Sequence, residues 1–350
     1  MKPCRVLVGS ALVSLCFSFG GAQAQVITEF SDGITAGAQP LGIAVGPDGN
    51  LWFTEFNGGN QIGRITPLGV VTEFAIGITP GALPYGIAAG ADGNLWFTEQ
   101  SINSDINQIG RITQAGVITE FAFGISAGSN PFFIAAGPDG NLWFAESTAN
   151  RVAQITSGGI VTEFSAGICT PANCPPFGAT PVGIALGPDG NLWFTEASSD
   201  RIGRITPAGV VTEFSAGITA GASPFGITAG PDGNLWFTEN VGNRIGRITP
   251  AGVVTEFDAG ISPNARLFGI AAGADGNLWF TEQLGNQIGR ITPSGVVTEF
   301  FVGMSFNADP SGIVAGPDGN LWFAELDGRI GRITTGALGD LIFADGFEEP

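Results

Sequence analysis

The chain has 350 residues with 31 acidic side chains, 13 lysines and arginines and no histidine, and its formal net charge is −18. This acidity argues against nucleic acid or anionic lipid as a partner. The lack of histidine excludes every mechanism in which an imidazole acts as a base or a metal ligand.

The first 24 residues have the pattern of a secretory signal peptide. Met1–Arg5 is basic, residues 6–19 are apolar, and Ala22-Gln23-Ala24 is a small-residue cleavage site. The apolar run is shorter than the roughly 20 residues of a membrane-spanning helix. We expect cleavage after Ala24 and a secreted or periplasmic protein without membrane insertion. Residues 25–350 then hold eleven arginines, no lysine and 31 acids, a formal charge of −20 (11 − 31).

A sequence of the form Gly-(Pro/Ala)-Asp-Gly-Asn-Leu-Trp-Phe-(Thr/Ala)-Glu occurs seven times, at intervals of 43 to 50 residues. This period, with several short strands in each copy, is typical of a β-propeller. We predict an all-β, seven-bladed propeller over residues 25–334 and a separate acidic, aromatic tail over residues 335–350. The seven tryptophans are Trp52, Trp96, Trp143, Trp193, Trp236, Trp279 and Trp322.

The fifth copy indicates four strands per blade. The expected strands are an inner strand at 224–230, a bulky strand at 235–239, an alternating strand at 243–249 and an outer strand at 253–257. Pro-Asp-Gly-Asn at 231–234 is a tight turn. No segment has helical periodicity.

The two ends of the repeat array predict how the ring closes. The last copy has the third strand, Arg329–Ile333, but no outer strand after it, whereas Val26–Phe30 carries an outer-strand sequence before the first copy. We predict that Val26–Phe30 completes the seventh blade and leaves no open sheet edge.

Two irregular insertions lie on the face where the loops vary in length. One spans residues 100–108, and the other contains Cys169 and Cys174, which we expect to form a local disulfide in an exported chain. Variable loops on a rigid scaffold commonly carry binding sites. We call this face the mouth and expect it to bind a small molecule or a protein partner. We also expect the protein to be a monomer.

Two sets of repeated side chains, one apolar and one of glutamates, are predicted to meet at the mouth. The apolar set either lines a ligand cup or packs the narrow end of the channel. The glutamate three residues after each tryptophan is expected to accept structural hydrogen bonds, with the arginine of Ile-Gly-Arg-Ile as candidate partner. The glutamate of Val-Thr-Glu-Phe is expected on a solvated face. The first set is Leu41, Tyr85, Phe132, Val182, Phe225, Phe268 and Ser311, and the second is Glu55, Glu99, Glu146, Glu196, Glu239, Glu282 and Glu325.

Positions where the copies differ mark either a ligand site or drift in the array. Phe133 replaces a motif glycine, and Gln154 replaces a motif arginine. The predicted ligand-binding residues are Tyr85, Phe225, Arg266, Phe268, Asp309 and Ser311.

The four motifs, Pro-x-Gly-Ile, Gly-Pro-Asp-Gly-Asn-Leu-Trp-Phe-Thr-Glu, Asn-Arg-Ile-Gly-Arg-Ile-Thr and Val-Thr-Glu-Phe, together resemble the streptogramin (virginiamycin B) lyase family over residues 26–334. The resemblance implies opening of a cyclic depsipeptide by elimination, with Mg²⁺ at the mouth. It places the two family histidines on Phe268 and Ser311, and the catalytic glutamate at or beside Glu325. Glu282 and Glu325 are the candidate ligands for Mg²⁺ or Ca²⁺.

Elimination needs a general base near neutral pH, and neither phenylalanine nor serine supplies one. We therefore expect an exported binding or scaffold propeller without lyase activity. The alternatives are a divergent metal-dependent lyase or lactonase acting at the mouth, and a purely structural protein.

Overall fold

The computed structural model describes residues 25–100, 107–169, 174–176 and 178–336. The predicted signal peptide, residues 337–350 of the predicted tail and most of the insertion at 100–108 lie outside these residues. All regular elements in the described ranges are strands. Within them, no helix is long and apolar enough to cross a membrane.

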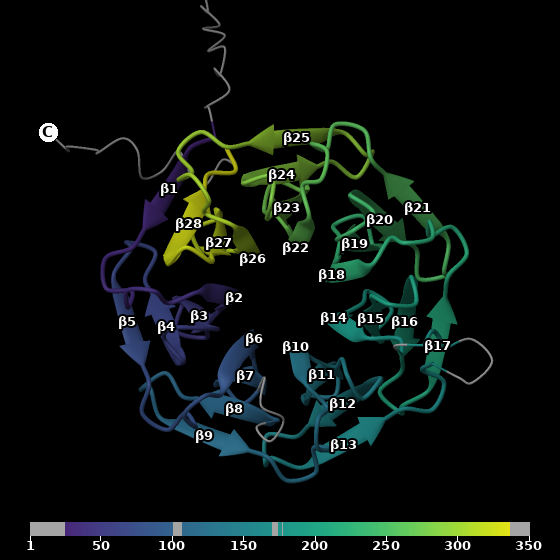
Figure 1. Ribbon diagram of the computed structural model, residues 1–350, viewed down its shortest axis with the longest axis horizontal. Coiled ribbons are helices and arrows are strands. Elements are labelled where there is room, and N and C mark those ends of the chain that lie inside the picture. Colours follow the sequence, from purple (N-terminus) through teal and green to yellow (C-terminus); the bar gives the residue numbers. More distant parts are fainter. Residues whose placement is uncertain (1–24, 101–106, 170–173, 177, 337–350) are drawn as a thin grey trace, which may run out of the picture.

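The described strands form seven four-stranded antiparallel sheets, the blades, arranged around an axis (Figure 1). This arrangement confirms the predicted seven-bladed propeller. Blades 1 to 3 comprise β2 (Pro40–Val45), β3 (Leu51–Glu55), β4 (Gln61–Ile65) and β5 (Val71–Phe74); β6 (Leu83–Ala89), β7 (Leu95–Gln100), β8 (Gln108–Ile112) and β9 (Ile118–Phe121); β10 (Pro131–Ala136), β11 (Leu142–Glu146), β12 (Arg151–Ile155) and β13 (Val161–Phe164).

Blades 4 to 7 repeat the same plan. They comprise β14 (Pro181–Leu186), β15 (Leu192–Glu196), β16 (Arg201–Ile205) and β17 (Val211–Phe214); β18 (Pro224–Ala229), β19 (Leu235–Glu239), β20 (Arg244–Ile248) and β21 (Val254–Phe257); β22 (Leu267–Ala272), β23 (Leu278–Glu282), β24 (Gln287–Ile291) and β25 (Val297–Phe300); β26 (Pro310–Ala315), β27 (Leu321–Glu325), β28 (Arg329–Ile333) and β1 (Ile27–Phe30).

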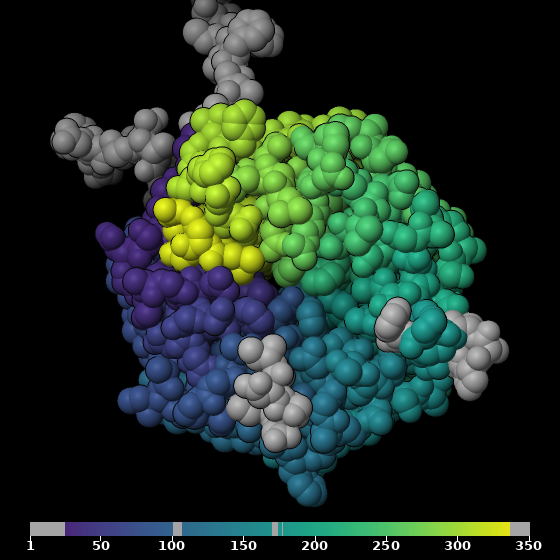
Figure 2. Space-filling model, in the orientation of Figure 1, coloured from purple at the N-terminus to yellow at the C-terminus, as the bar shows by residue number. Residues whose placement is uncertain are grey.

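The N-terminal strand closes the ring, as predicted. β1 pairs antiparallel with β28, with Ile27 opposite Ile333 and Phe30 opposite Ile330. The Thr334 amide donates to the Val26 carbonyl, so the chain ends of the propeller are held together just beyond the strands. In the space-filling view, the purple N-terminal blade surface lies directly against the yellow C-terminal one (Figure 2).

The repeated tryptophan motif builds the contacts between and within blades. Trp52 is fully buried and donates from Nε1 to Asp48 in the preceding turn at 3.0 Å. The Trp52 ring stacks on Phe74 of the outer strand, and Arg64 covers the Trp52 ring at 5.4 Å. Arg64 also donates to the Gln114 carbonyl in the next blade. The motif arginine therefore packs on tryptophan and does not pair with the glutamate that we predicted as its partner.

The predicted disulfide between Cys169 and Cys174 is present in the connection that leads into blade 4. The Cys169 amide donates to the Glu213 carboxylate at 3.1 Å. This hydrogen bond ties the cysteine loop to the outer strand of the same blade.

Candidate functional site

Five aromatic side chains meet at the mouth end of the channel, and we call Tyr85, Phe132, Phe133, Phe225 and Phe268 the aromatic floor. The Tyr85 and Phe132 ring centroids are 4.2 Å apart, and those of Phe225 and Phe268 are 4.6 Å apart. Phe133 contacts the other four rings at centroid distances of 5.3 to 6.1 Å. Such tilted and edge-to-face contacts are favourable for aromatic pairs. The predicted apolar set therefore packs across the channel.

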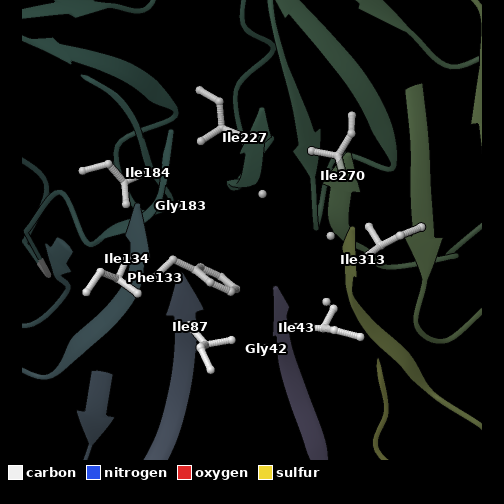
Figure 3. A pocket seen from close by; sticks show the side chains of 13 residues that line it. Gly42, Ile43, Ile87, Phe133, Ile134, Gly183, Ile184, Ile227, Ile270 and Ile313 are labelled. Carbon is white, nitrogen blue, oxygen red and sulfur yellow. The ribbon is translucent and has the colours of Figure 1, made fainter. Parts of the chain in front are cut away.

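Phe133 projects a large side chain into the channel at a position where the other blades have glycine. In six blades this inner-strand position is glycine; a Cβ at Gly42, for example, would lie 2.4 Å from the Tyr85 carbonyl oxygen of the next blade. Figure 3 shows the Phe133 ring pointing into the channel, surrounded by an isoleucine from each blade. The cavity lined by these residues has a volume of about 130 Å³. Phe133 thus belongs both to the aromatic floor and to the lining of this cavity.

Ser311, a predicted ligand-binding residue, is fully buried. In blade 6, Thr281 donates from Oγ1 to the Ser311 carbonyl of the next blade at 2.7 Å. Blade 7 has Ala324 at the position of Thr281, so it lacks this hydroxyl. The Ser311 hydroxyl is placed to supply the missing donor, because it lies 3.2 Å from the Leu41 carbonyl oxygen and 3.3 Å from the Pro40 carbonyl oxygen of blade 1, as well as 3.1 Å from the Ala324 carbonyl oxygen of its own blade. Ser311 therefore joins blades 7 and 1.

We expect Ser311→Ala to lower the free energy of unfolding by about 1 kcal/mol, the usual net value of a hydrogen bond. Adding Ala324→Thr should recover most of this loss, since it restores the hydroxyl that five other blades carry. Urea denaturation of the single and double variants measures both effects. Failure of the second substitution to rescue the first would contradict the proposed replacement of one hydroxyl by the other.

The glutamates that follow the tryptophans, which we call the ring glutamates, do not line the mouth. All seven have 0% exposed surface. Each lies beside the glutamate of the outer strand in its own blade. The pairs are Glu55 with Glu73, Glu99 with Glu120, Glu146 with Glu163, Glu196 with Glu213, Glu239 with Glu256, Glu282 with Glu299, and Glu325 with Glu29.

The outer-strand glutamates are not on a solvated face, contrary to our prediction. Glu256 accepts hydrogen bonds from the backbone amide and the hydroxyl of Thr219, both at 2.6 Å. Thr219 lies in the connection that enters the blade, so the carboxylate fastens this connection to the outer strand. The threonine, serine or cysteine amide at this position donates to the outer-strand glutamate in every blade.

The two carboxyl groups of a pair titrate in opposite directions in blade 5. Burial, followed by the neighbouring Glu256, raises the pKa of Glu239 from 4.5 to about 8. Burial opposes ionisation of Glu256, but the hydrogen bonds from Thr219 outweigh it and hold the pKa of Glu256 below its usual value. At neutral pH the proton therefore resides on Glu239, which donates to the Glu256 carboxylate.

A third side chain accompanies each glutamate pair, at the first position of the third strand of the blade. The sequence analysis did not identify this residue as part of the site. It is an arginine in four blades and a glutamine in three. Arg151 lies 2.6 Å from Glu163, and Arg244 lies 3.5 Å from Glu239. The available signal was the recurrence of two glutamates and one Arg or Gln at fixed spacing in each copy. The residues are Gln61, Gln108, Arg151, Arg201, Arg244, Gln287 and Arg329.

The candidate cation ligands do not fit a divalent metal site. Glu282 and Glu325 are buried in different blades, and burial raises the pKa of each to about 9. Mg²⁺ and Ca²⁺ prefer ionised carboxylates and water oxygens. No group of three or more Cys, Asp or Glu side chains is arranged to hold a metal within the part of the chain that the structure describes.

The remaining predicted ligand-binding residues come together at the mouth. Tyr85, Phe225 and Phe268 belong to the aromatic floor. Arg266 and Asp309 precede the inner strands of the neighbouring blades 6 and 7, and both have left-handed backbones, with φ of 55° and 50°. Arg266 is exposed, whereas Asp309 is half-buried.

Comparison with known proteins identifies the relatives of this propeller. The Virginiamycin B lyase family model matches residues 22–216 and 169–341. Virginiamycin B lyase from Staphylococcus aureus is 38% identical, with a TM-score of 0.78 over 89% of this chain and 99% of that chain. A catalytically inactive histidine-to-alanine variant of that lyase, solved with quinupristin, is 38% identical, with a TM-score of 0.79 over the same shares.

A streptogramin B lyase structure is 37% identical, with a TM-score of 0.78 over 88% of this chain and 97% of that chain. No curated protein matches the sequence significantly. The family model and these structures cover most of the chain. The protein belongs to the Virginiamycin B lyase family.

Proposed function

We propose that this protein is an exported binding propeller that takes a small aromatic or apolar molecule on its aromatic floor and has no lyase activity. Export rests on the signal-peptide pattern of residues 1–24. The observation that carries the rest of the proposal is the replacement of the family histidines. Phe268 belongs to the aromatic floor, and Ser311 is buried as a structural hydrogen-bond donor.

The related lyase from Staphylococcus aureus is inactive when one histidine is replaced by alanine. This chain has no histidine at any position. Glu325 does not substitute as a base for a substrate at the mouth, because its side chain is fully buried and faces Glu29 and Arg329. The chemistry of elimination is therefore missing, while the scaffold that presents the mouth is intact.

The floor itself supports binding. Phe132, Phe133 and Phe225 are half-buried, so parts of three aromatic residues of the floor remain accessible. Phe56 and Leu326 extend this apolar surface. Aromatic surfaces held rigidly by neighbouring rings are suited to stacking on a flat ligand.

Calorimetric titration with the neutral probe 2-naphthamide tests this function. We expect saturable binding that Phe225→Ala weakens about fivefold, the effect of losing one aromatic contact. Phe123→Ala is the matched control, because Phe123 is 92% exposed in the connection between β9 and β10 and does not belong to the floor. Equal weakening by both variants, or no binding by the native protein, would refute the proposed site.

A further inference from the structure

Ten of the eleven arginines in residues 25–350 have a structural partner that follows the repeat. Six cover a tryptophan ring at 5.3 to 5.5 Å, and four lie beside the glutamate pairs. The first group is Arg64, Arg111, Arg204, Arg247, Arg290 and Arg332. The second group is Arg151, Arg201, Arg244 and Arg329.

Arg266 is the eleventh, and it has neither role. No carboxylate oxygen of the described residues lies within 4.0 Å of its guanidinium group. No described ring lies beneath it in a cation–π contact. Its residue is exposed, so this positive charge is accessible to a ligand on the surface of a strongly acidic protein.

The backbone that carries Arg266 is fixed. The Gln283 amide donates to the Arg266 carbonyl at 3.1 Å, and the Asn243 side chain accepts the amide of the preceding Ala265 at 2.7 Å. The next residue, Leu267, is fully buried and starts β22. The anchor is therefore rigid, and only the side chain is free to adjust.

The side chain acts across the mouth. Burial raises the pKa of Tyr85, and the positive charge of Arg266 opposes this rise. Arg266 lies two residues before Phe268 of the aromatic floor, in blade 6, and Tyr85 belongs to blade 2 across the axis (Figure 1). Asp309 is the acidic residue at the matching position of blade 7, and Asp327 of that blade is ion-paired with Arg329.

We propose that Arg266 makes the mouth selective for small aromatic molecules that carry a carboxylate. The aromatic floor stacks the ring, and the exposed guanidinium pairs with the anionic group. Arginine suits this role because its planar guanidinium binds a carboxylate through two parallel hydrogen bonds. The inference rests on the proposed binding function and adds the chemical class of its ligand.

The test compares 2-naphthoate with 2-naphthamide, which have the same ring and differ in charge. Calorimetry at pH 7 and 0.15 M salt limits the long-range repulsion between the acidic protein and the anion. We expect 2-naphthoate to bind about tenfold more tightly, in the range of a charge-assisted hydrogen bond. Arg266→Gln should abolish this preference, so that the variant binds the two probes with the same affinity. Asp309→Asn should strengthen naphthoate binding, because it removes a negative charge near the site.

Arg290→Gln is the matched control for net charge. Blade 3 naturally carries Gln154 at the equivalent position, so the repeat tolerates this substitution. The control should retain the preference for naphthoate. A native protein that binds naphthamide as tightly as naphthoate, or equal loss of preference in both arginine variants, would overturn the anion site while leaving the binding function intact. Failure of both probes to bind would overturn the binding function itself.

Discussion

Raising the pH from 5 to 9.5 is expected to lower the melting temperature by more than about 10 °C, because each blade buries a protonated ring glutamate. The pKa values of Glu55, Glu146, Glu196 and Glu239 rise to about 8, and those of Glu282 and Glu325 rise to about 9. Burial is the main cause in each case.

The sign of this pH dependence follows because the folded chain holds these protons more tightly than the unfolded chain. Below pH 4.5 the ring glutamates are protonated in both the folded and the unfolded chain, so their contribution to the free energy of unfolding is fully present. Above this pH the unfolded chain releases its protons first. Each group then lowers the free energy of unfolding by up to about 1.4 kcal/mol per pH unit until the folded pKa is passed.

The composition leaves few other groups that titrate in this pH range. Residues 25–350 contain no histidine and no lysine, and burial raises the pKa of the one tyrosine, Tyr85. The ring glutamates are therefore the main groups expected to titrate in this range, together with the amino terminus and Asp327, whose pKa is also raised by burial. Thermal unfolding followed by circular dichroism across this range measures the effect, and a flat or rising melting temperature would contradict it.

Glu282→Gln should reduce the fall of the melting temperature with rising pH, because glutamine still donates to Glu299 and does not ionise. Glu299→Gln is the matched control. Glu299 accepts hydrogen bonds from the amide and the hydroxyl of Ser262, the latter at 2.8 Å, so replacing one of its oxygens with an amide nitrogen should destabilise the protein without removing this pH dependence. Identical pH profiles for the two variants would refute the assignment of the proton to Glu282.

Ile27→Asp is expected to prevent stable closure of the ring and to cost at least about 4 kcal/mol, since it places a charge in an apolar core. Ile27 is 4% exposed and packs with Trp279, Leu321 and Ile333 where blade 7 meets blade 6. Opening this seam would also expose the edge of β28 to other chains.

Thr28→Asp is the control for this prediction. Thr28 is the neighbouring residue of the same strand, but its side chain is exposed. We expect a change of less than about 1 kcal/mol from this substitution. Guanidinium denaturation and light scattering compare the two variants. Equal stability of both would mean that β1 does not hold the ring closed.

The repeat period was sufficient to predict the architecture, because the same buried Leu-Trp-Phe segment recurs in every blade. The missing outer strand after Ile333 and the spare one before Pro40 then identified the closure. Both inferences depend only on patterns along the chain. The tight Asp-Gly-Asn turn was equally readable, since its residues tolerate the required backbone conformation.

The partners of charged side chains could not be read in this way. Glu55 and Glu73 are 18 positions apart, yet their side chains interact in the folded blade, where Glu73 lies opposite Gly63. The missing side chain of Gly63 accommodates the Phe53 ring. The sequence placed Glu55 at the mouth and Glu73 in solvent. A buried glutamate that keeps its proton has no distinguishing pattern in a single sequence.

Departures from the repeat were informative in two different ways. Ser311 differs from its counterparts because Ala324 removes a hydroxyl in the same blade, so it compensates within the scaffold. Arg266 has no such compensating neighbour, and it remains exposed beside the aromatic floor. Telling these cases apart required the contacts of each residue.

Incubation of the purified protein with quinupristin, followed by mass spectrometry and chromatography, tests the central claim most directly. Quinupristin is the molecule solved with the inactive variant of the related lyase. With excess protein, added Mg²⁺ and long incubation, we predict that the cyclic depsipeptide is recovered intact. A linear product that forms with the native protein and disappears with Glu325→Ala would contradict the account and identify the protein as an active lyase.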